Sequence, residues 1–257
     1  MIFSPSIDAV FKNFQGSIDD KLGVIRSCGY EAFEIWGWWG RDMDALQAAQ
    51  ERYELKLAAM CTRTTSLVDA EQRTVCIEAL KESLQVAERF QCRYLITQTG
   101  NAMPGVPREI LRQSLIEGLK EAAPHVEEAG VTLIVEPLNT KFDHRGYFLE
   151  RSDEAFEVIE AVGSPNVKIV YDIYHQQISE GNLIPTITAN MDKIAYFHMA
   201  DHPGRHEPGT GEIHYPNVLK AIRKTGYQGY MGLEYFPSTD AETSLRSFMD
   251  QTVSLWK

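Results

Sequence analysis

Four residues of metal-ligand type each close a short apolar run in the second half of the chain. They are Glu136 in LIVEPLN, Asp172 in KIVYDIYH, His198 in IAYFHMAD and Glu234 in YMGLEYFP. Each run is typical of a buried strand, and the gaps of 36, 26 and 36 residues are about the length of a strand-helix-strand unit. If the strands are neighbours in a closed barrel, the four side chains meet at one rim. Three carboxylates and an imidazole brought together repel one another unless a divalent cation lies between them. The pattern therefore predicts a metal-dependent enzyme.

This set of ligand types also restricts the metal. Carboxylates with one imidazole suit Mn²⁺, Mg²⁺, Co²⁺ or Zn²⁺, and the lack of thiolates in the set argues against a structural zinc site. Taken singly, each residue has another interpretation, because an acidic residue at a strand end often caps a helix or pairs with a loop cation. All four together are harder to explain structurally, since burying such a charged group without a cation is costly.

The elements that must position these residues alternate along the whole chain. Segments such as 70–90 and 106–129 have the apolar spacing of amphipathic helices. Between the helical segments, short β-branched or aromatic runs occur near residues 2–4, 31–36, 55–60, 93–98, 131–136, 167–172, 194–199 and 230–235. Eight strands, each followed by a helix, over about 250 residues are typical of an α/β fold, the (β/α)8 TIM barrel, whose active site lies at the C-terminal rim of the strands.

The turn residues favour one domain over residues 1–257. Gly29, Gly130 and Gly226 each stand before an expected strand, where a glycine can take the left-handed conformation that ends a helix. Pro124 is expected to kink or shorten the helix over 106–129. No proline-rich or low-complexity linker divides the sequence. An open doubly wound sheet is the competing architecture, but its GxGxxG signal is missing from the first strand-helix turn.

Composition narrows the class of partner. The 257 residues are 44% hydrophobic, enough for a sizeable core, and carry a net charge of −11, which argues against nucleic acid. The N-terminus shows no signal-peptide pattern, and no apolar stretch approaches the ~20 residues of a membrane span. The four cysteines are Cys28, Cys61, Cys76 and Cys92, and their spacing matches no metal-binding motif. We expect them to be free thiols in a reducing cytoplasm. We therefore expect a cytoplasmic protein with a small-molecule partner.

Other polar and aromatic residues are expected beside the same rim. His175 should lie in the loop after the sixth strand, where it would hydrogen-bond a substrate hydroxyl or transfer a proton, or else simply bond a backbone carbonyl. The loop DHPGRHEPGTGEI, residues 201–213, is a candidate lid. In it, Arg205 is a candidate to hold a substrate oxygen, the alternative being a surface ion pair with Glu207.

Aromatic residues follow the second strand at this rim, namely Trp36, Trp38 and Trp39. Indole rings suit the apolar faces of sugars, but they equally suit a subunit contact in a homodimer or homotetramer. The charged segment after the fifth strand, residues 141–145, ranks below the four ligand types because charged loops are usually solvated.

The longer motifs resemble those of a known group of proteins. VEPLN at 135–139, YDIYHQQISEGNL at 171–183, GRHEPGTGEIHYP at 204–216 and GYQGYMGLEY at 226–235 resemble the sugar isomerase and epimerase barrels of the xylose isomerase-like superfamily, above all the hydroxypyruvate isomerase-like branch. The resemblance is specific over roughly residues 125–236. It implies a divalent metal held by Glu136, Asp172, His198 and Glu234, with Glu136 and Glu234 as the acid/base pair. It also implies substrate contacts from His175 and Arg205.

The expected chemistry is proton transfer beside a polarised carbonyl. A metal that chelates a hydroxyl and a carbonyl oxygen of a small sugar or keto acid makes the neighbouring C–H more acidic and stabilises a cis-enediolate. One glutamate removes the proton. Its return to the adjacent carbon gives aldose-ketose isomerisation, as with hydroxypyruvate, whereas return from the opposite face gives 3-epimerisation of a free ketose.

Three further functions are weaker candidates. A sugar or inosose dehydratase would begin with the same proton abstraction. A metal phosphoesterase would need extra His or Glu ligands on strands two to four and a basic groove, but strands three and four end in CTRTTS and TQTGN. A non-catalytic sugar-binding barrel would leave the four ligand types unexplained.

Overall fold

A computed structural model gives the fold and describes residues 1–63 and 65–255. Within that part of the chain, eight parallel strands form one sheet, ordered β1-β8-β7-β6-β5-β4-β3-β2. A parallel bridge from Ser6 to Glu34 joins the ends of β1 and β2 and closes the sheet into a barrel. The strands are β1 (Ile2–Pro5), β2 (Ala32–Ile35), β3 (Lys56–Cys61), β4 (Tyr94–Thr97), β5 (Thr132–Val135), β6 (Val167–Asp172), β7 (Ile194–Met199) and β8 (Tyr230–Leu233).

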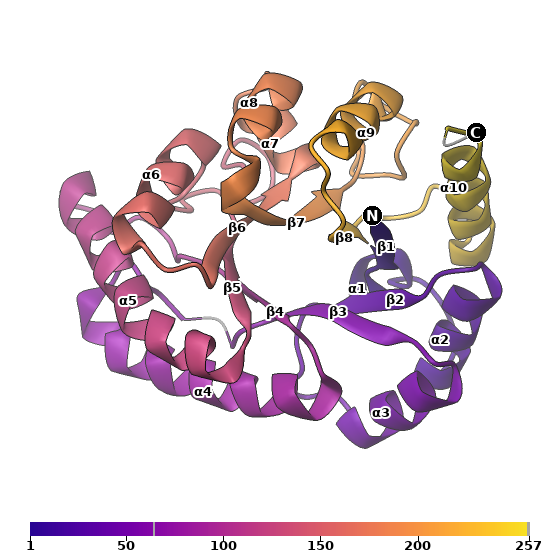
Figure 1. The fold of residues 1–257 in the computed structure, drawn as a ribbon, viewed down its shortest axis with the longest axis horizontal. Coiled ribbons are helices and arrows are strands. Elements are labelled where there is room, and N and C mark those ends of the chain that lie inside the picture. Colours follow the sequence, from indigo (N-terminus) through magenta and orange to yellow (C-terminus); the bar gives the residue numbers. More distant parts are fainter. Residues whose placement is uncertain (64, 256–257) are drawn as a thin grey trace.

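Helices surround these strands (Figure 1). They are α1 (Ile7–Val10), α2 (Ile18–Ser27), α3 (Met43–Arg52), α4 (Arg73–Phe90), α5 (Arg108–Ala129), α6 (Ser152–Val162), α7 (Ile173–Ser179), α8 (Leu183–Ala189), α9 (Tyr215–Lys224) and α10 (Ala241–Leu255), with 3₁₀ turns at Ala70–Gln72 and Met191–Lys193. The predicted TIM barrel is confirmed. In the described chain, none of the helices is both long enough and apolar enough to cross a membrane.

The helix ends follow the expected turn chemistry, with one exception inside α5. Gly29, Gly130 and Gly226 all have positive φ, at 87°, 63° and 86°. This is the left-handed conformation that ends a helix at low steric cost in glycine. Pro124 does not shorten its helix, because α5 runs without a break from Arg108 to Ala129. The apolar face on either side of Pro124 is buried against the core, and this packing outweighs the missing backbone donor.

Alternation along the strands separates two apolar layers. Phe197 faces outward and packs against Tyr171 and Tyr227 in the layer between strands and helices. Its neighbours on β7, Tyr196 and His198, face the barrel interior, because successive side chains of a strand point to opposite faces. The interior cluster consists of Ala32, Ala58, Ala59, Ile96, Ile134, Val170 and Tyr196. Two residues beyond Ile134, Val170 and Tyr196 come Glu136, Asp172 and His198, so the inward rows lead to the C-terminal rim.

Candidate active site and metal centre

The four residues of metal-ligand type come together at the C-terminal rim. One ligand atom from each of Glu136, Asp172, His198 and Glu234 lies within 4.8 Å of the others, and all four residues are buried. We call these four residues the quartet. Nδ1 of His198 faces the three carboxylates, at 2.9 Å from Glu136 Oε1, 3.5 Å from Glu234 Oε2 and 4.0 Å from Asp172 Oδ2. The convergence expected from spacing alone is therefore present in the folded chain.

The strand ends hold these side chains in place. Glu136 and Glu234 directly follow β5 and β8, and their backbone N–H groups continue the ladder by donating to Thr97 and Met199. Asp172 ends β6 and also caps α7, with Oδ1 accepting from the backbone N–H of His175 at 3.1 Å. Helix capping, the alternative considered for an acidic residue at a strand end, therefore applies to Asp172. Its second carboxylate oxygen, Oδ2, still faces His198.

Burial and mutual charge shift the acidity of the quartet. Burial raises the pKa of Asp172 to about 7, with Arg205 opposing the rise and Glu234 adding to it. For Glu234, burial also acts upward, but Arg205 and His198 outweigh it and hold the pKa below its usual value. Burial alone would lower the pKa of His198, yet the nearby carboxylates outweigh burial and raise it well above its usual range. Burial and mutual charge thus favour the protonated forms of Asp172 and His198 and the ionised form of Glu234.

His175 lies in α7, and the prediction that it lies in a loop was wrong, because the helix begins immediately after β6. Its Nδ1 accepts from the backbone N–H of Asn139 at 3.2 Å and lies 2.6 Å from Asn139 Nδ2. The proton is therefore assigned to Nε2, which is buried without a hydrogen-bond partner in the described structure and lies 3.6 Å from Asp172 Oδ2. Burial, then Arg205, hold the pKa of His175 well below its usual range, so the ring is a neutral donor.

Arg205 reaches the quartet from the loop after β7. Its Nη2 donates to Glu234 Oε2 at 2.5 Å, and its guanidinium lies over the ring of Tyr174 at 5.3 Å. The alternative ion pair with Glu207 is wrong, since Glu207 instead accepts from Ser238.

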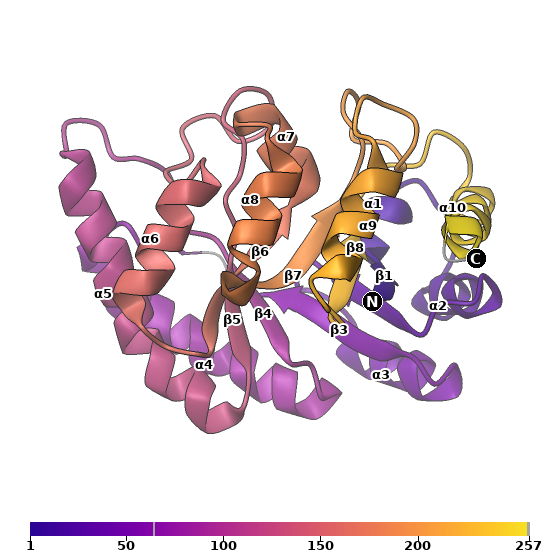
Figure 2. The same cartoon turned by 45° about the horizontal axis from the view of Figure 1, so that its top comes forward.

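The candidate lid, residues 201–213, is held at its base by Asp201, whose carboxylate accepts hydrogen bonds from three backbone N–H groups. Figure 2 shows this loop between β7 and α9, at the same end of the barrel as α7.

The tryptophan cluster divides into separate roles. Nε1 of Trp36 donates to Glu234 Oε1 at 2.5 Å, so this residue belongs to the site, a contact that the sequence did not reveal. Trp38 instead donates to Ser83. Trp39 packs edge-on against Trp38 and is 40% exposed.

Glu34 is a second residue that the sequence analysis missed. It is fully buried in the barrel interior, where Tyr196 donates to its Oε2 at 2.7 Å. The sequence did contain a signal for Glu34, because it is a charged residue inside the apolar run AFEI. The members of the quartet stand in the same way at the ends of apolar runs.

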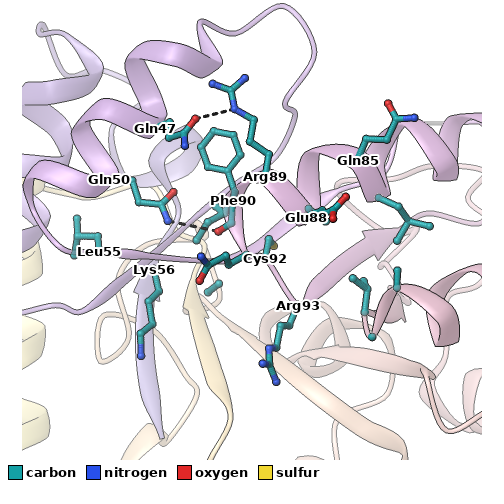
Figure 3. Close-up of a pocket in the computed structure, with 18 of the residues that line it drawn as sticks. Gln47, Gln50, Leu55, Lys56, Gln85, Glu88, Arg89, Phe90, Cys92 and Arg93 are labelled. Carbon is teal, nitrogen blue, oxygen red and sulfur yellow. Dashed lines mark hydrogen bonds between the residues drawn. The ribbon is translucent and has the colours of Figure 1, made fainter.

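A broad hollow at the opposite end of the barrel is a less suitable site (Figure 3). It is lined by the starts of β3 and β4, at Lys56 and beside Arg93, and by polar residues of α3 and α4. Some of these polar groups pair with one another, as when Arg89 donates to Gln47 at 2.8 Å. Because catalytic groups of TIM barrels lie at the C-terminal rim, the quartet is the stronger candidate.

Comparison with known proteins places this geometry in a family. The family model described as "Xylose isomerase-like TIM barrel" matches residues 22–251. The chain belongs to this family. A hydroxypyruvate isomerase of Escherichia coli K12 is 32% identical over 227 residues, which are 85% of this chain and 88% of that protein. A 2-oxo-tetronate isomerase of Cupriavidus necator is 37% identical over 134 residues, covering 52% of this chain and 51% of the relative.

A solved structure supports the same fold. The crystal structure of an AP endonuclease, family 2, from Brucella melitensis matches with a TM-score of 0.90 and 25% identity, covering 97% of this chain and 98% of that one. Hydrolysis of a phosphoester would need metal ligands beyond the quartet. In this chain, however, β3 and β4 end at Cys61 and Thr97, and the group of candidate metal ligands found among the described residues consists of the quartet. A phosphoesterase was expected to need extra His or Glu ligands on strands two to four. Strands β3 and β4 end without such a residue, and the one on β2, Glu34, is not in this group.

Proposed function

We propose that this protein is a divalent-metal-dependent isomerase that interconverts a small hydroxy-aldehyde and the matching ketone through a cis-enediolate, as in hydroxypyruvate isomerase. The observation that carries the proposal is the buried quartet, whose ligand atoms lie within 4.8 Å of one another. The hydroxypyruvate isomerase of Escherichia coli, at 32% identity over most of both chains, supports the reaction class.

The donor set fits a divalent cation. Three carboxylates and one imidazole nitrogen are ligands that Mn²⁺, Mg²⁺, Co²⁺ and Zn²⁺ accept. The pKa of Asp172 and that of His198 are both raised, which reduces the negative charge of the buried group in the absence of a cation. This supports a divalent cation as the group that would balance the carboxylates. When bound by the quartet, the cation would polarise the substrate carbonyl and stabilise negative charge on its oxygens.

Glu136 and Glu234 are proposed as the acid/base pair. They approach Nδ1 of His198 from β5 and β8, at 2.9 and 3.5 Å, so two carboxylates are available to a substrate carbon held near this rim. For Glu234, Arg205 and His198 outweigh burial and hold the pKa below its usual value, so the carboxylate is ionised and can accept a proton. It would remove the proton from the hydroxyl-bearing carbon next to the carbonyl. Delivery of a proton to the former carbonyl carbon, with movement of the hydroxyl proton from one oxygen to the other, completes isomerisation.

His175 and Arg205 are proposed as substrate contacts. The unpartnered Nε2–H of His175 is a buried donor beside Asp172, suited to a substrate oxygen. Arg205 has a fork of donors, and its Nε is buried without a partner in the described structure. A substrate oxygen or carboxylate would take up donors that Glu234 does not occupy.

The presence of two carboxylates also supports a second candidate, 3-epimerisation of a free ketose. If Glu136 and Glu234 lie on opposite faces of the bound substrate, one removes a proton and the other returns it with inversion. A dehydratase that begins with the same abstraction is a third candidate. Which outcome follows depends on where the substrate carbon lies between the two residues.

The proposal includes a small sugar or keto acid as partner, a cytoplasmic location and assembly as a homodimer or homotetramer. The exposed rings of Trp39 and Phe142 favour assembly, because large aromatic side chains left in water gain free energy when a partner covers them. The net charge of −11 continues to argue against a nucleic-acid partner.

The test is proton exchange in D₂O followed by NMR. Metal-stripped protein and protein reloaded with Mn²⁺ are given hydroxypyruvate and, separately, a panel of free ketoses, and the protein and metal are removed before spectra are taken. We expect deuterium incorporation and a new isomer only with metal. The substrate that exchanges identifies isomerase or epimerase. Absence of exchange with every compound would refute the enediolate mechanism and favour a dehydratase or a binding protein.

A further inference from the structure

Glu34 lies inside the barrel, directly beneath the quartet. It comes from β2, which supplies no member of the quartet, and its side chain is almost completely buried. Oε2 accepts a hydrogen bond from the Tyr196 hydroxyl at 2.7 Å, and Oε1 lies 3.5 Å from Nε2 of His198. A carboxylate removed from water in this way needs partners for both oxygens, because burying it without them is costly.

The two ring nitrogens of His198 face opposite surroundings. Nδ1 faces the three carboxylates of the quartet, and Nε2 faces Glu34. In the described structure Nε2 is buried and makes no hydrogen bond within the usual geometric limits. An imidazole that binds a metal through one nitrogen carries its proton on the other, and the acceptor of that proton decides which nitrogen is free.

The surrounding residues leave room for this carboxylate and orient it. Gly232 on β8 lies beside His198 and Ser4 in the sheet. A Cβ at position 232 would clash with Glu34 Oε2 and with the His198 ring. Beneath Glu34, Ser4 Oγ lies 2.7 Å from the Tyr196 hydroxyl. Since that hydroxyl donates to Glu34, Ser4 is the donor to Tyr196, and the short chain points its protons toward the carboxylate.

We propose that Glu34 is a positioning residue, which accepts the proton of His198 Nε2 and thereby keeps Nδ1 free to bind the metal. This role rests on the metal centre proposed above. Glu34 is not in the group of candidate metal ligands found among the described residues, and the member of the quartet that its carboxylate faces is His198. Carboxylates that orient a metal-binding histidine typically contribute about 10- to 100-fold in metal affinity.

Metal affinity in the absence of substrate tests the role directly. We expect Glu34→Gln to weaken Mn²⁺ binding by about 10- to 100-fold in calorimetric titration. The amide keeps the shape of the carboxylate, but it cannot accept from both Tyr196 and His198. Glu31→Gln makes the same chemical change at an exposed position immediately before this strand and should leave the affinity unchanged. Tyr196→Phe removes the hydroxyl that orients Glu34 but keeps the contact between Glu34 and His198, so we expect a smaller loss of affinity than in Glu34→Gln. A Glu34→Gln protein that binds Mn²⁺ as tightly as the wild type would overturn the assignment.

A second measurement uses the wild-type protein, so it does not require any variant to fold. In long-range ¹H–¹⁵N spectra of the Zn²⁺-loaded protein, we expect the His198 proton on Nε2, in slow exchange with water, and the Nδ1 shift of a metal ligand. A proton on Nδ1, or ligation through Nε2, would overturn the role of Glu34. A wild type that binds neither metal would refute the metal centre itself. Failure of the isomerase assay with normal metal binding would refute only the proposed reaction.

Discussion

Nη2 of Arg205 lies 2.5 Å from Oε2 of Glu234, and this ion pair is almost completely enclosed at the rim. The other oxygen of the same carboxylate accepts from Trp36 at 2.5 Å. Glu234 is therefore held on both sides before any cation or substrate arrives. Because Arg205 is positively charged, it opposes a divalent cation at the quartet, while its remaining donors are available to a substrate oxygen.

Replacing Arg205 should consequently move two measured quantities in opposite directions. In Arg205→Met, we expect Mn²⁺ to bind about tenfold more tightly, because a competing cation has been removed at short range. We expect KM for the substrate to rise by about 10- to 100-fold, because a charge-assisted contact is lost. Calorimetry and steady-state kinetics give the two values. Arg246→Met, which removes an exposed ion pair of α10, is the matched control. A parallel weakening of metal and substrate would show that Arg205 merely supports the loop.

Each of the two glutamates should be indispensable for turnover. Glu136→Gln and Glu234→Gln keep the side-chain volume and remove the group that exchanges a proton, so we expect kcat to fall by at least about 10²- to 10⁴-fold in each. Circular dichroism should show an unchanged fold. Mn²⁺ titration separates loss of metal from loss of the acid or base, since excess metal would restore only the former. Retained activity in either variant would contradict the two-glutamate scheme.

Metal binding should depend on pH in a defined direction. Burial raises the pKa of Asp172 to about 7, so below pH 7 the cation must displace a proton from this carboxyl. The dissociation constant for Mn²⁺ should therefore increase as pH falls, approaching about a hundredfold per pH unit below pH 7, because one proton leaves Asp172 and one leaves His198 for each cation bound. Above pH 7 affinity should still improve, because the pKa of His198 is raised and its proton must also leave. Calorimetry at pH 6, 7 and 8, in two buffers of different ionisation enthalpy, counts the released protons. A constant affinity without proton release would contradict this origin.

The fold and the quartet were predictable because both depend on local periodicity. Each member of the quartet ends an apolar run, and in a closed barrel a two-residue alternation is enough to bring strand ends such as Asp172 and His198 to one rim. The single error in their surroundings, the placement of His175 in a loop, reflects how soon α7 begins after β6. Helix boundaries of this kind depend on a cap, here the side chain of Asp172, for which capping and metal binding were weighed as alternatives.

Contacts across the barrel were not predictable from local pattern. Trp36 and Glu234 are far apart in sequence, as are Glu34 and His198, and only closure of the sheet between β1 and β2 brings them together. Arg205 was expected at the site, but nothing in its loop indicated that it would form an ion pair with Glu234 rather than with Glu207. That choice follows from burial, because a desolvated carboxylate attracts the guanidinium more strongly than an exposed one.

The Trp36 indole should matter through its N–H rather than through its size. Trp36→Phe keeps an aromatic ring at the rim and removes the donor to Glu234 Oε1, so the carboxylate loses one of its two constraints. We expect kcat to fall by about 10- to 160-fold, the range of a hydrogen bond to a charged group, with little change in KM. Trp39→Phe is the matched control, because Trp39 lies at the same rim and is 40% exposed, against 37% for Trp36. Equal losses in the two variants would assign the cluster to a sugar-stacking wall or a subunit contact, and a loss confined to KM in Trp36→Phe would exclude a role in holding the base.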